Sequence, residues 1–155
     1  MEFFGIDKTM QHYLTKGAFV VSGEKPNVMT ASWGMIGVLW GKKVALIPIR
    51  QSRFTKEFID KTGEFTLSVP FGSMQKELTF CGTKSGRDID KFEALGLQKI
   101  KADKVNTYKV GGCDEYFECK VLTSYTLKEE DLPQEVKDYA YKTGDYHTLY
   151  IAEIL

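Results

Sequence analysis

The chain has 155 residues, 43% of them hydrophobic and 27% charged, which is the composition of a globular protein long enough to bury a core. Lysine plus arginine and aspartate plus glutamate both total 21, and this balance argues against nucleic acid as the main partner, because phosphate backbones require a strongly basic face. No apolar run approaches the roughly 20 residues of a membrane-spanning helix, so we expect no membrane partner. We expect a single domain over residues 1–155.

Residues 1–5 lack the basic start and the long apolar stretch of a signal peptide, which predicts a cytoplasmic protein. The three cysteines, Cys81, Cys113 and Cys119, include no C-x-x-C pair. An odd number of cysteines without such a pair is typical of reduced thiols in a reducing compartment.

The first third of the chain has the pattern of an antiparallel meander. Residues 18–23 form an expected strand that ends in a turn, and residues 43–49 form another. Between them runs a long apolar segment, 28–40, which is interrupted by Gly34 and Gly37. Glycines inside a strand indicate bulges or a sharp bend, as at the corner of a barrel.

The middle third alternates helices and strands. A helix is expected over residues 52–62, because its apolar residues share one face and Gly63 stands where a C-terminal cap belongs. A strand is expected over residues 64–69, and a second helix begins at Ser73 with a loose capping pattern.

The last third returns to strands after a polar loop. Expected strands lie at 107–110, 115–126 and 146–154, and short helices lie at 90–95 and from residue 132 onward. We therefore predict a mainly β fold with two or three short inserted helices. A closed or partly closed antiparallel barrel would hide the strand edges of such a chain.

The run from Asn27 to Trp33 is strand-like but small and polar in its middle, at Thr30, Ala31 and Ser32. Buried strands prefer large aliphatic or aromatic residues. Small side chains leave room for a flat group beside the backbone, and the hydroxyls and N–H groups offer it hydrogen bonds. The run is therefore either a solvent-facing edge or the wall of a ligand site.

The run from Arg50 to Thr55 lies where a strand passes into a helix. Free N–H groups and the positive end of a helix dipole favour an anion. Arg50 and Arg53, with the hydroxyls of Ser52 and Thr55, have the charge and geometry for a phosphate. The alternative is that Ser52 caps the helix and both arginines are solvated, and the run alone does not decide between the two.

A third run combines Ser85 and Gly86 in a polar loop with Lys91 in the helix that follows. Such a loop can wrap backbone amides around an oxygen-rich ligand, although a plain surface turn is the commoner outcome. Taken together, the three runs fit one nucleotide-like ligand. None of them needs a catalytic side chain, as is typical where a cofactor carries the chemistry, and we predict no catalytic residue.

Other candidate residues are weaker. His12 and His147 are isolated in the sequence, so we expect no metal site and assign both to packing at the surface or in the core. Cys81 precedes Gly82 just before the polar loop, and a buried, inert thiol is the favoured interpretation.

Three blocks, in this order, resemble the flavin reductase-like family, the FMN-binding split barrel, and in particular its flavoredoxin-like branch. The order and spacing of the three blocks are more specific than any single block. The blocks are Asn27-x-Met29-Thr30-Ala31-Ser32-Trp33, Arg50-x-Ser52-Arg53-x-Thr55, and Phe80-Cys81-Gly82-Thr83-Lys84-Ser85-Gly86-Arg87-Asp88-x-Asp90-Lys91-Phe92.

The resemblance implies an antiparallel Greek-key split β-barrel of six strands, a homodimer, and non-covalent FMN near the subunit interface. It implies three groups of cofactor-binding residues. The isoalloxazine and the ribityl chain would be lined by Asn27, Thr30, Ala31, Ser32 and Trp33. The phosphate would be held by Arg50, Ser52, Arg53 and Thr55, and the site would be closed over phosphate or ring by Ser85, Gly86 and Lys91.

The resemblance also implies an FMN-dependent oxidoreductase in which NADH or NADPH stacks on the exposed flavin face and passes hydride to N5. A cation such as Lys91 would stabilise the reduced, anionic flavin. Two alternatives stay open. One is a flavoredoxin-like electron-transfer protein that takes electrons from a redox partner protein, and the other is a non-catalytic flavin- or haem-binding carrier or sensor.

Overall fold

A computed structural model describes residues 6–155, and its centre is a seven-stranded antiparallel sheet with the strand order β2-β1-β5-β8-β9-β4-β3. The expectation about a signal peptide falls on residues 1–5 and lies outside the described residues. The strands of this sheet are β1 (Ala18–Ser22), β2 (Asn27–Ala31), β3 (Met35–Leu39), β4 (Lys42–Arg50), β5 (Glu64–Val69), β8 (Glu115–Thr126) and β9 (His147–Ile154). A separate two-stranded sheet pairs β6 (Lys99–Lys101) with β7 (Tyr108–Val110).

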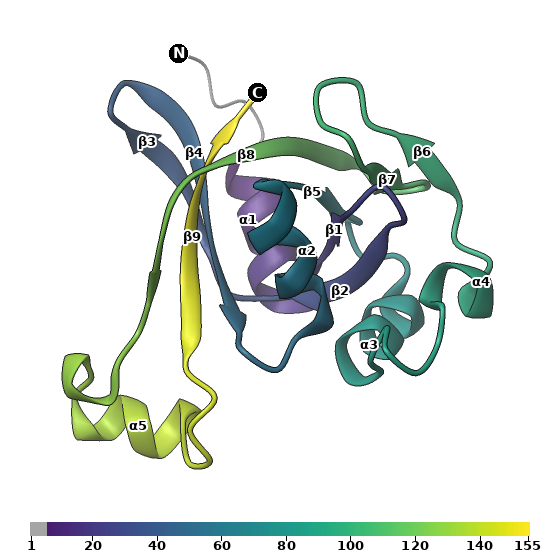
Figure 1. Cartoon of the computed structure of the whole chain (residues 1–155). Helices are drawn as coiled ribbons and strands as arrows, with labels where there is room; N and C mark the ends of the chain where they lie inside the picture. The colour runs from purple at the N-terminus through teal and green to yellow at the C-terminus, as the bar shows by residue number, and fades with distance from the viewer. Residues whose placement is uncertain (1–5) are drawn as a thin grey trace.

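The long strand β8 joins the two halves of the sheet, and it crosses the top of the molecule in Figure 1. Its first part pairs with β5 and its second part with β9, with a register shift between Val121 and Thr123. A bulge of this kind bends a strand, so one continuous strand serves both halves. The sheet also brings β2 and β4 into contact, although they do not pair.

The largest core cluster lies inside this curved sheet. It contains the inward-facing residues of six strands and one helix, namely Val20, Met29, Ala31, Ala45, Ile47, Ile49, Ile59, Phe65, Leu67, Cys119, Tyr150 and Ala152. Strands that share one interior in the order β2-β1-β5-β8-β9-β4 form the predicted split β-barrel, and β3 extends the sheet beyond β4 as a seventh strand.

The described residues contain more helices than the two or three that we expected. Five α-helices and one 3₁₀-helix are present: α1 (Ile6–Lys16), α2 (Phe54–Thr62), α3 (Gln75–Thr83), α4 (Lys91–Leu95), η1 (Glu129–Asp131) and α5 (Gln134–Ala140). In Figure 1, α3 and α4 lie at one end of the barrel, and α5 lies apart at the foot of β9. None of these helices is long and apolar enough to span a membrane.

The predicted stop signals are correct, whereas one predicted start is wrong. Gly63 and Gly96 end α2 and α4 in the left-handed conformation that glycine adopts at little cost. The loose capping pattern from Ser73 does not form, because α3 begins two residues later with Met74 as its N-cap and no side-chain cap.

The apolar run over residues 28–40 bends at Gly34, which separates β2 from β3. A Cβ atom on Gly34 would lie 2.7 Å from the carbonyl oxygen of Leu46 and 2.8 Å from the hydroxyl oxygen of Tyr13. That hydroxyl donates a 2.7 Å hydrogen bond to the Trp33 carbonyl. Helix α1 therefore fixes the bend, and Trp33 with it, by contacts that only glycine permits.

Candidate functional site

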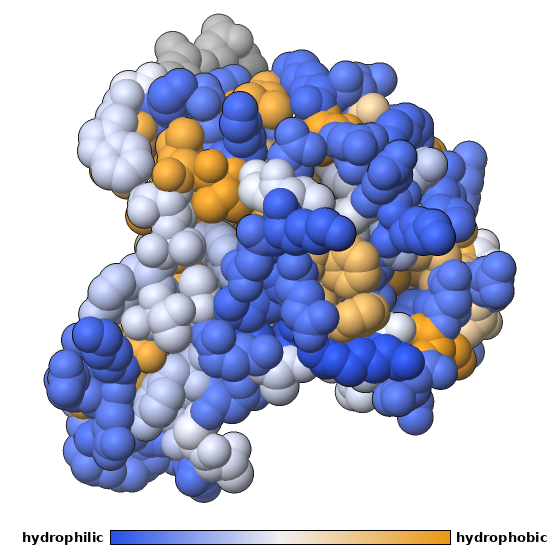
Figure 2. Space-filling model, viewed as in Figure 1, coloured by the Kyte–Doolittle hydropathy of each residue, from blue (hydrophilic) through white to orange (hydrophobic). Residues whose placement is uncertain are grey.

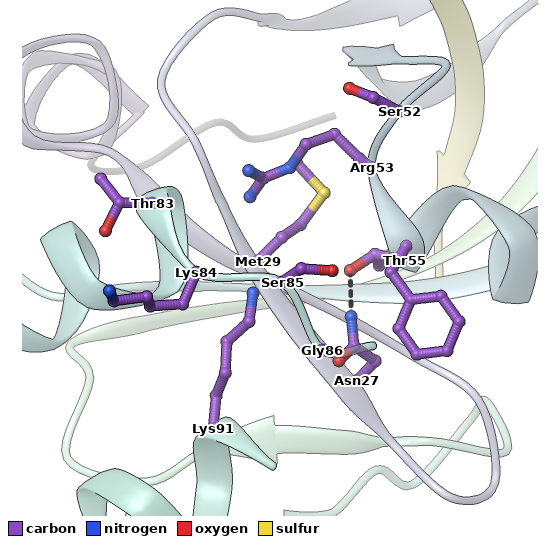
Figure 3. A pocket seen from close by; sticks show the side chains of 11 residues that line it. Asn27, Met29, Ser52, Arg53, Thr55, Thr83, Lys84, Ser85, Gly86 and Lys91 are labelled. Atoms are coloured by element: carbon purple, nitrogen blue, oxygen red, sulfur yellow. Dashed lines mark hydrogen bonds between the residues drawn. The ribbon is translucent and has the colours of Figure 1, made fainter. Parts of the chain in front are cut away.

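A small cavity lies where the start of β2, the start of α2 and the loop after α3 meet (Figure 3). We call it the anion cavity, and its volume is about 120 Å³. It collects residues from all three sequence blocks that the resemblance uses. They are Asn27, Met29, Ser52, Arg53, Phe54, Thr55, Thr83, Lys84, Ser85, Gly86 and Lys91.

Two cations reach the anion cavity without a carboxylate partner. The Lys91 side chain is only 3% exposed, and its ammonium donates a 2.9 Å hydrogen bond to the carbonyl oxygen of Cys81. Arg53 donates to the same oxygen at 3.1 Å and to the Gly82 carbonyl at 2.9 Å. Among the described residues, neither cation forms a salt bridge.

The position of these cations follows from the end of a helix. The carbonyls of Cys81 and Gly82 belong to the last turn of α3, where backbone acceptors have no partner within the helix and the dipole is negative. These acceptors hold both cations in place but carry only partial charge. Two nearly full positive charges are therefore left for an anion.

The charge state of Lys91 reflects this crowding. Burial, together with the positive charge of Arg53, lowers the pKa of Lys91 to about 8. Burial also lowers the pKa of Arg53. Because the site destabilises the charged forms of Arg53 and Lys91, an incoming anion would stabilise it.

Hydroxyl groups and a glycine complete the anion cavity. Thr55 is fully buried and its hydroxyl oxygen accepts a 2.8 Å hydrogen bond from the Asn27 amide, while Figure 3 shows the Ser85 hydroxyl turned toward that of Thr55. Gly86 packs so closely on Asn27 that an added Cβ would lie 1.8 Å from its amide oxygen. Glycine is required there because the loop backbone must approach β2 this closely.

A second cavity of about 220 Å³, which we call the ring cavity, continues from the first. The two share Met29 and Arg53, so they adjoin each other, and together we call them the cleft. The ring cavity is lined by Met29, Thr30, Ala31, Ser32, Trp33, Pro48, Arg50, Arg53 and His147. The anion cavity and the ring cavity together suit an elongated ligand with an anionic end and a flat end.

The wall over residues 30–33 is not the open row of hydroxyls that the sequence suggested. The Thr30 hydroxyl donates a 2.6 Å hydrogen bond to the Leu78 carbonyl and thereby packs α3 on β2. Ala31 is buried, whereas Ser32 and Trp33 are exposed, Trp33 by 42%. The wall therefore offers small apolar surface and one partly free indole, which suits stacking better than hydrogen bonding.

An apolar groove of about 400 Å³ adjoins the ring cavity and shares Trp33, Pro48 and His147 with it. It lies between the β3–β4 side of the sheet and α5, and the outline in Figure 2 is indented between these two lobes. Tyr139 on its rim is 82% exposed. The ring cavity is therefore open on an apolar side.

His147 is buried in the wall of the ring cavity, although its sequence context showed no partner. Its Nδ1 atom lies 2.5 Å from the hydroxyl of Tyr141, and its ring lies 5.3 Å from that of Trp33. Burial, with the positive charge of Arg50, lowers the pKa of His147 to about 4. The imidazole is therefore neutral near pH 7.

The cysteine thiols take no part in the charge balance of the cleft. Cys81 is fully buried, and burial raises the pKa of its thiol to about 11. All three cysteines are free. Cys81 therefore contributes its backbone carbonyl, not a reactive thiol.

The family model of the flavin reductase-like domain matches residues 10–155. The chain belongs to the flavin reductase-like family. An uncharacterized protein of Archaeoglobus fulgidus is 34% identical over 144 residues, which cover 92% of this chain and 71% of the relative. An uncharacterized protein of Pyrococcus abyssi is 29% identical over 157 residues, covering 100% and 77% respectively.

Two solved structures share this fold and extend over most of the chain. Flavoredoxin of Desulfovibrio vulgaris superimposes with a TM-score of 0.71 at 24% identity, covering 92% of this chain and 68% of flavoredoxin. The NADH:FAD oxidoreductase SgcE6 of Streptomyces globisporus superimposes with a TM-score of 0.67 at 18% identity, covering 90% and 73%. These likenesses confirm the split-barrel fold of the family member described here.

The structure sorts the twelve predicted site residues into the two cavities. The anion cavity is lined by Asn27, Ser52, Arg53, Thr55, Ser85, Gly86 and Lys91, and the ring cavity by Thr30, Ala31, Ser32, Trp33, Arg50 and Arg53. Asn27 therefore lines the anion cavity and not the ring cavity, where the other residues of its predicted group lie. Its place follows from its hydrogen bond to Thr55, which ties the start of β2 to the start of α2.

Sequence reasoning missed the residues that come from outside the three blocks. Pro48, Tyr141 and His147 lie in or behind the ring cavity, and Tyr13 fixes the Trp33 carbonyl from α1. The pairing of β4 with β9 sets Arg50 opposite His147, a register that no local pattern shows. Tyr146 and His147, two adjacent aromatic residues at the start of the last expected strand, were the only local signal in the sequence.

Proposed function

We propose that this family member binds FMN in the cleft, with the phosphate in the anion cavity and the isoalloxazine in the ring cavity. The observation that carries the proposal is the pair of cations, Arg53 and Lys91, held by carbonyls and left without a carboxylate. Holding two such charges together is costly, and a phosphate dianion would repay that cost with charge-assisted hydrogen bonds.

The residues present fit FMN at both ends. A phosphate finds two cations and the hydroxyls of Thr55 and Ser85, beside a loop whose Gly86 permits close approach of the backbone. A flat ring finds Ala31, the Trp33 indole and an opening to an apolar groove. Bound FMN would supply the two-electron redox chemistry, and the chain would bind it, orient it and exclude water.

We further propose an oxidoreductase activity with NADH or NADPH as the hydride donor. The support is family membership together with the open apolar side of the ring cavity, where a nicotinamide ring could stack against the flavin. The neighbour SgcE6 is an NADH:FAD oxidoreductase, which shows that the fold can support such a reaction. The contribution of the chain is the orientation of two rings in contact, which needs no acid or base.

We also propose a homodimer that forms through the β3 side of the sheet. Strand β3 is an edge strand, and Met35, Val38 and Trp40 are exposed by 61%, 54% and 65%. Edges with exposed apolar side chains are sites of chain association. The adjacent groove would then lie near a subunit interface, and light scattering on the purified protein tests this assembly.

The cofactor is tested by titrating purified, flavin-free protein with FMN and with riboflavin. We expect FMN to bind more tightly by about 10-fold or more, since riboflavin lacks the phosphate. NADH and NADPH oxidation is then followed with added FMN. Oxidation of either nucleotide supports the enzyme, whereas FMN binding without it identifies an electron-transfer protein or a carrier. A protein that binds neither flavin contradicts the proposal.

A further inference from the structure

The turn between β4 and α2 is tied to the segment that precedes β9 by five hydrogen bonds. Arg50 donates to the carbonyls of Asp145 at 3.1 Å and Ala140 at 2.8 Å. The Gln51 amide donates to the Tyr146 carbonyl at 3.1 Å. The Ser52 N–H and hydroxyl donate to the two carboxylate oxygens of Asp145 at 3.0 and 2.6 Å. We call this set of contacts the latch.

The latch occupies groups that a phosphate would otherwise use. The Ser52 N–H and hydroxyl already serve an anion, because they donate one hydrogen bond to each carboxylate oxygen of Asp145. The guanidinium of Arg50 is committed to two carbonyls and lies over the Tyr141 ring at 5.2 Å. By contrast, Arg53 and Lys91 bond only to the end of α3 and face the anion cavity.

The latch holds the backbone that carries the wall of the ring cavity. Asp145 has a positive φ of 55°, and its neighbours continue directly into His147 and β9. Tyr141 lies at the other end of the latched segment and meets the His147 ring. Non-glycine residues adopt such a conformation uncommonly, although aspartate does so more readily than most, and the two bonds to Ser52 help to hold Asp145 in it.

We propose that Asp145 and Ser52 are positioning residues that set His147 in the wall of the ring cavity, together with its hydrogen-bond partner Tyr141, while the anion at the far end of the cleft is bound by Arg53 and Lys91. This inference rests on the proposed flavin site and divides it in two. The latch determines the affinity for the flavin ring, and the cations at the end of α3 determine the preference for a phosphate.

The test compares FMN with riboflavin in latch variants. Asp145→Gly removes the carboxylate and tolerates the positive φ, and Ser52→Ala removes one donor. We expect each to weaken FMN and riboflavin alike, by about 5- to 20-fold, so that the ratio of the two affinities stays within about twofold. Asp145→Asn, which keeps an acceptor for the Ser52 N–H, should recover part of the loss. Asp138→Asn, an exposed change on α5, is the control.

Two results would overturn the inference. If Asp145→Gly strengthens FMN binding relative to riboflavin, the carboxylate competes with the phosphate and Ser52 belongs to the phosphate site. If either variant lowers the melting temperature but leaves both affinities unchanged, the latch has only a structural role.

A flavin-independent measurement separates this inference from the proposed function. The chain has two histidines, so a proton NMR titration of the flavin-free protein shows two imidazole signals, from His12 and His147. Opening the latch hydrates His147, and its pKa should rise from about 4 in Ser52→Ala, because burial is the main cause of the low value. His12 lies in α1 and stacks on Phe71, so its signal is the internal reference for this comparison of variants. If the pKa of His147 is the same in Ser52→Ala as in the wild type, the positioning role is refuted, even if no flavin binds.

Discussion

Replacement of Lys91 by methionine should weaken FMN binding and stabilise the flavin-free protein at the same time. Methionine has a similar length and no charge, so it keeps the packing of a side chain that is 3% exposed. If Lys91 served only to stabilise the fold, its replacement would lower the free energy of unfolding, because Lys91 also donates a hydrogen bond to the Cys81 carbonyl.

The gain in stability follows from the pKa of the buried ammonium. A pKa of about 8 in place of 10.5 means that the folded protein binds this proton less tightly than the unfolded chain, by roughly 3 kcal/mol. Water in the cleft and the lost hydrogen bond reduce this amount, so we expect a gain of about 1–2 kcal/mol at pH 7. The charged ammonium destabilises the folded protein fully below pH 8, and this destabilisation disappears as the pH rises toward 10.5. The greater stability of the methionine variant should therefore vanish between pH 8 and pH 10.5.

The loss of affinity follows from one charge-assisted hydrogen bond to phosphate. Such a bond contributes about 1.5–3 kcal/mol, which corresponds to about 10- to 100-fold in the dissociation constant of FMN. Riboflavin should bind to the variant and the wild type almost equally. In the wild type, FMN affinity should fall as the pH rises through 8, because Lys91 then loses its proton.

The assay is flavin fluorescence quenching for both ligands and urea unfolding of the flavin-free protein from pH 7 to pH 10. Lys84→Met is the matched control, because Lys84 belongs to the same cavity lining but is exposed and points away from Lys91 in Figure 3. Equal weakening of FMN and riboflavin by Lys91→Met, or a clear loss of stability at pH 7, would refute the reasoning.

Three further predictions follow from single contacts. Gly86→Ala should lower the free energy of unfolding by about 1–3 kcal/mol and weaken FMN binding, because the added Cβ would meet the Asn27 amide oxygen. Urea unfolding measures the change, and Gly37→Ala, whose Cβ would meet nothing within 4 Å, is the control. His147→Phe should flatten the loss of stability as the pH falls from 6.5 toward 4, since over this interval the unfolded chain binds a proton that the buried ring of the folded state does not; a profile parallel to that of the wild type in acid unfolding would contradict the assigned burial. Tyr13→Phe removes a 2.7 Å hydrogen bond and should weaken FMN and riboflavin together by about fivefold in the same titration, and an effect confined to FMN would refute it.

Much of the fold was predictable because its signals are local. Gly63 and Gly96 mark helix ends by conformation alone, and the alternation over residues 64–69 and 146–154 matches β5 and β9. Helix α1 was missed because residues 6–16 are mostly polar. The contacts of α1 with β3 and β5 are tertiary, and no pattern within the helix shows them.

The candidate site was predictable where it lies on contiguous runs. The runs around Thr30, Arg53 and Ser85 carry most of the residues that meet in the cleft. The runs did not show which hydroxyls are free, since Thr30 and Ser52 are occupied by partners 48 and 93 positions away. Hydrogen bonds of this range depend on the register of distant elements, which a single sequence does not contain.

The cations of the anion cavity are held in a way that explains their charge. A carboxylate partner would fix Arg53 and Lys91 more firmly but would cancel the positive potential that a phosphate needs. Carbonyls at the end of α3 fix the same groups through dipoles, which orient a cation while neutralising little of its charge. The carboxylate of Asp145, whose charge acts on Arg53 without a salt bridge, is instead bonded to Ser52 in the latch. Separate partners for the two signs of charge therefore leave the anion cavity positive in the flavin-free protein, and under the proposed function this potential would select a phosphorylated ligand.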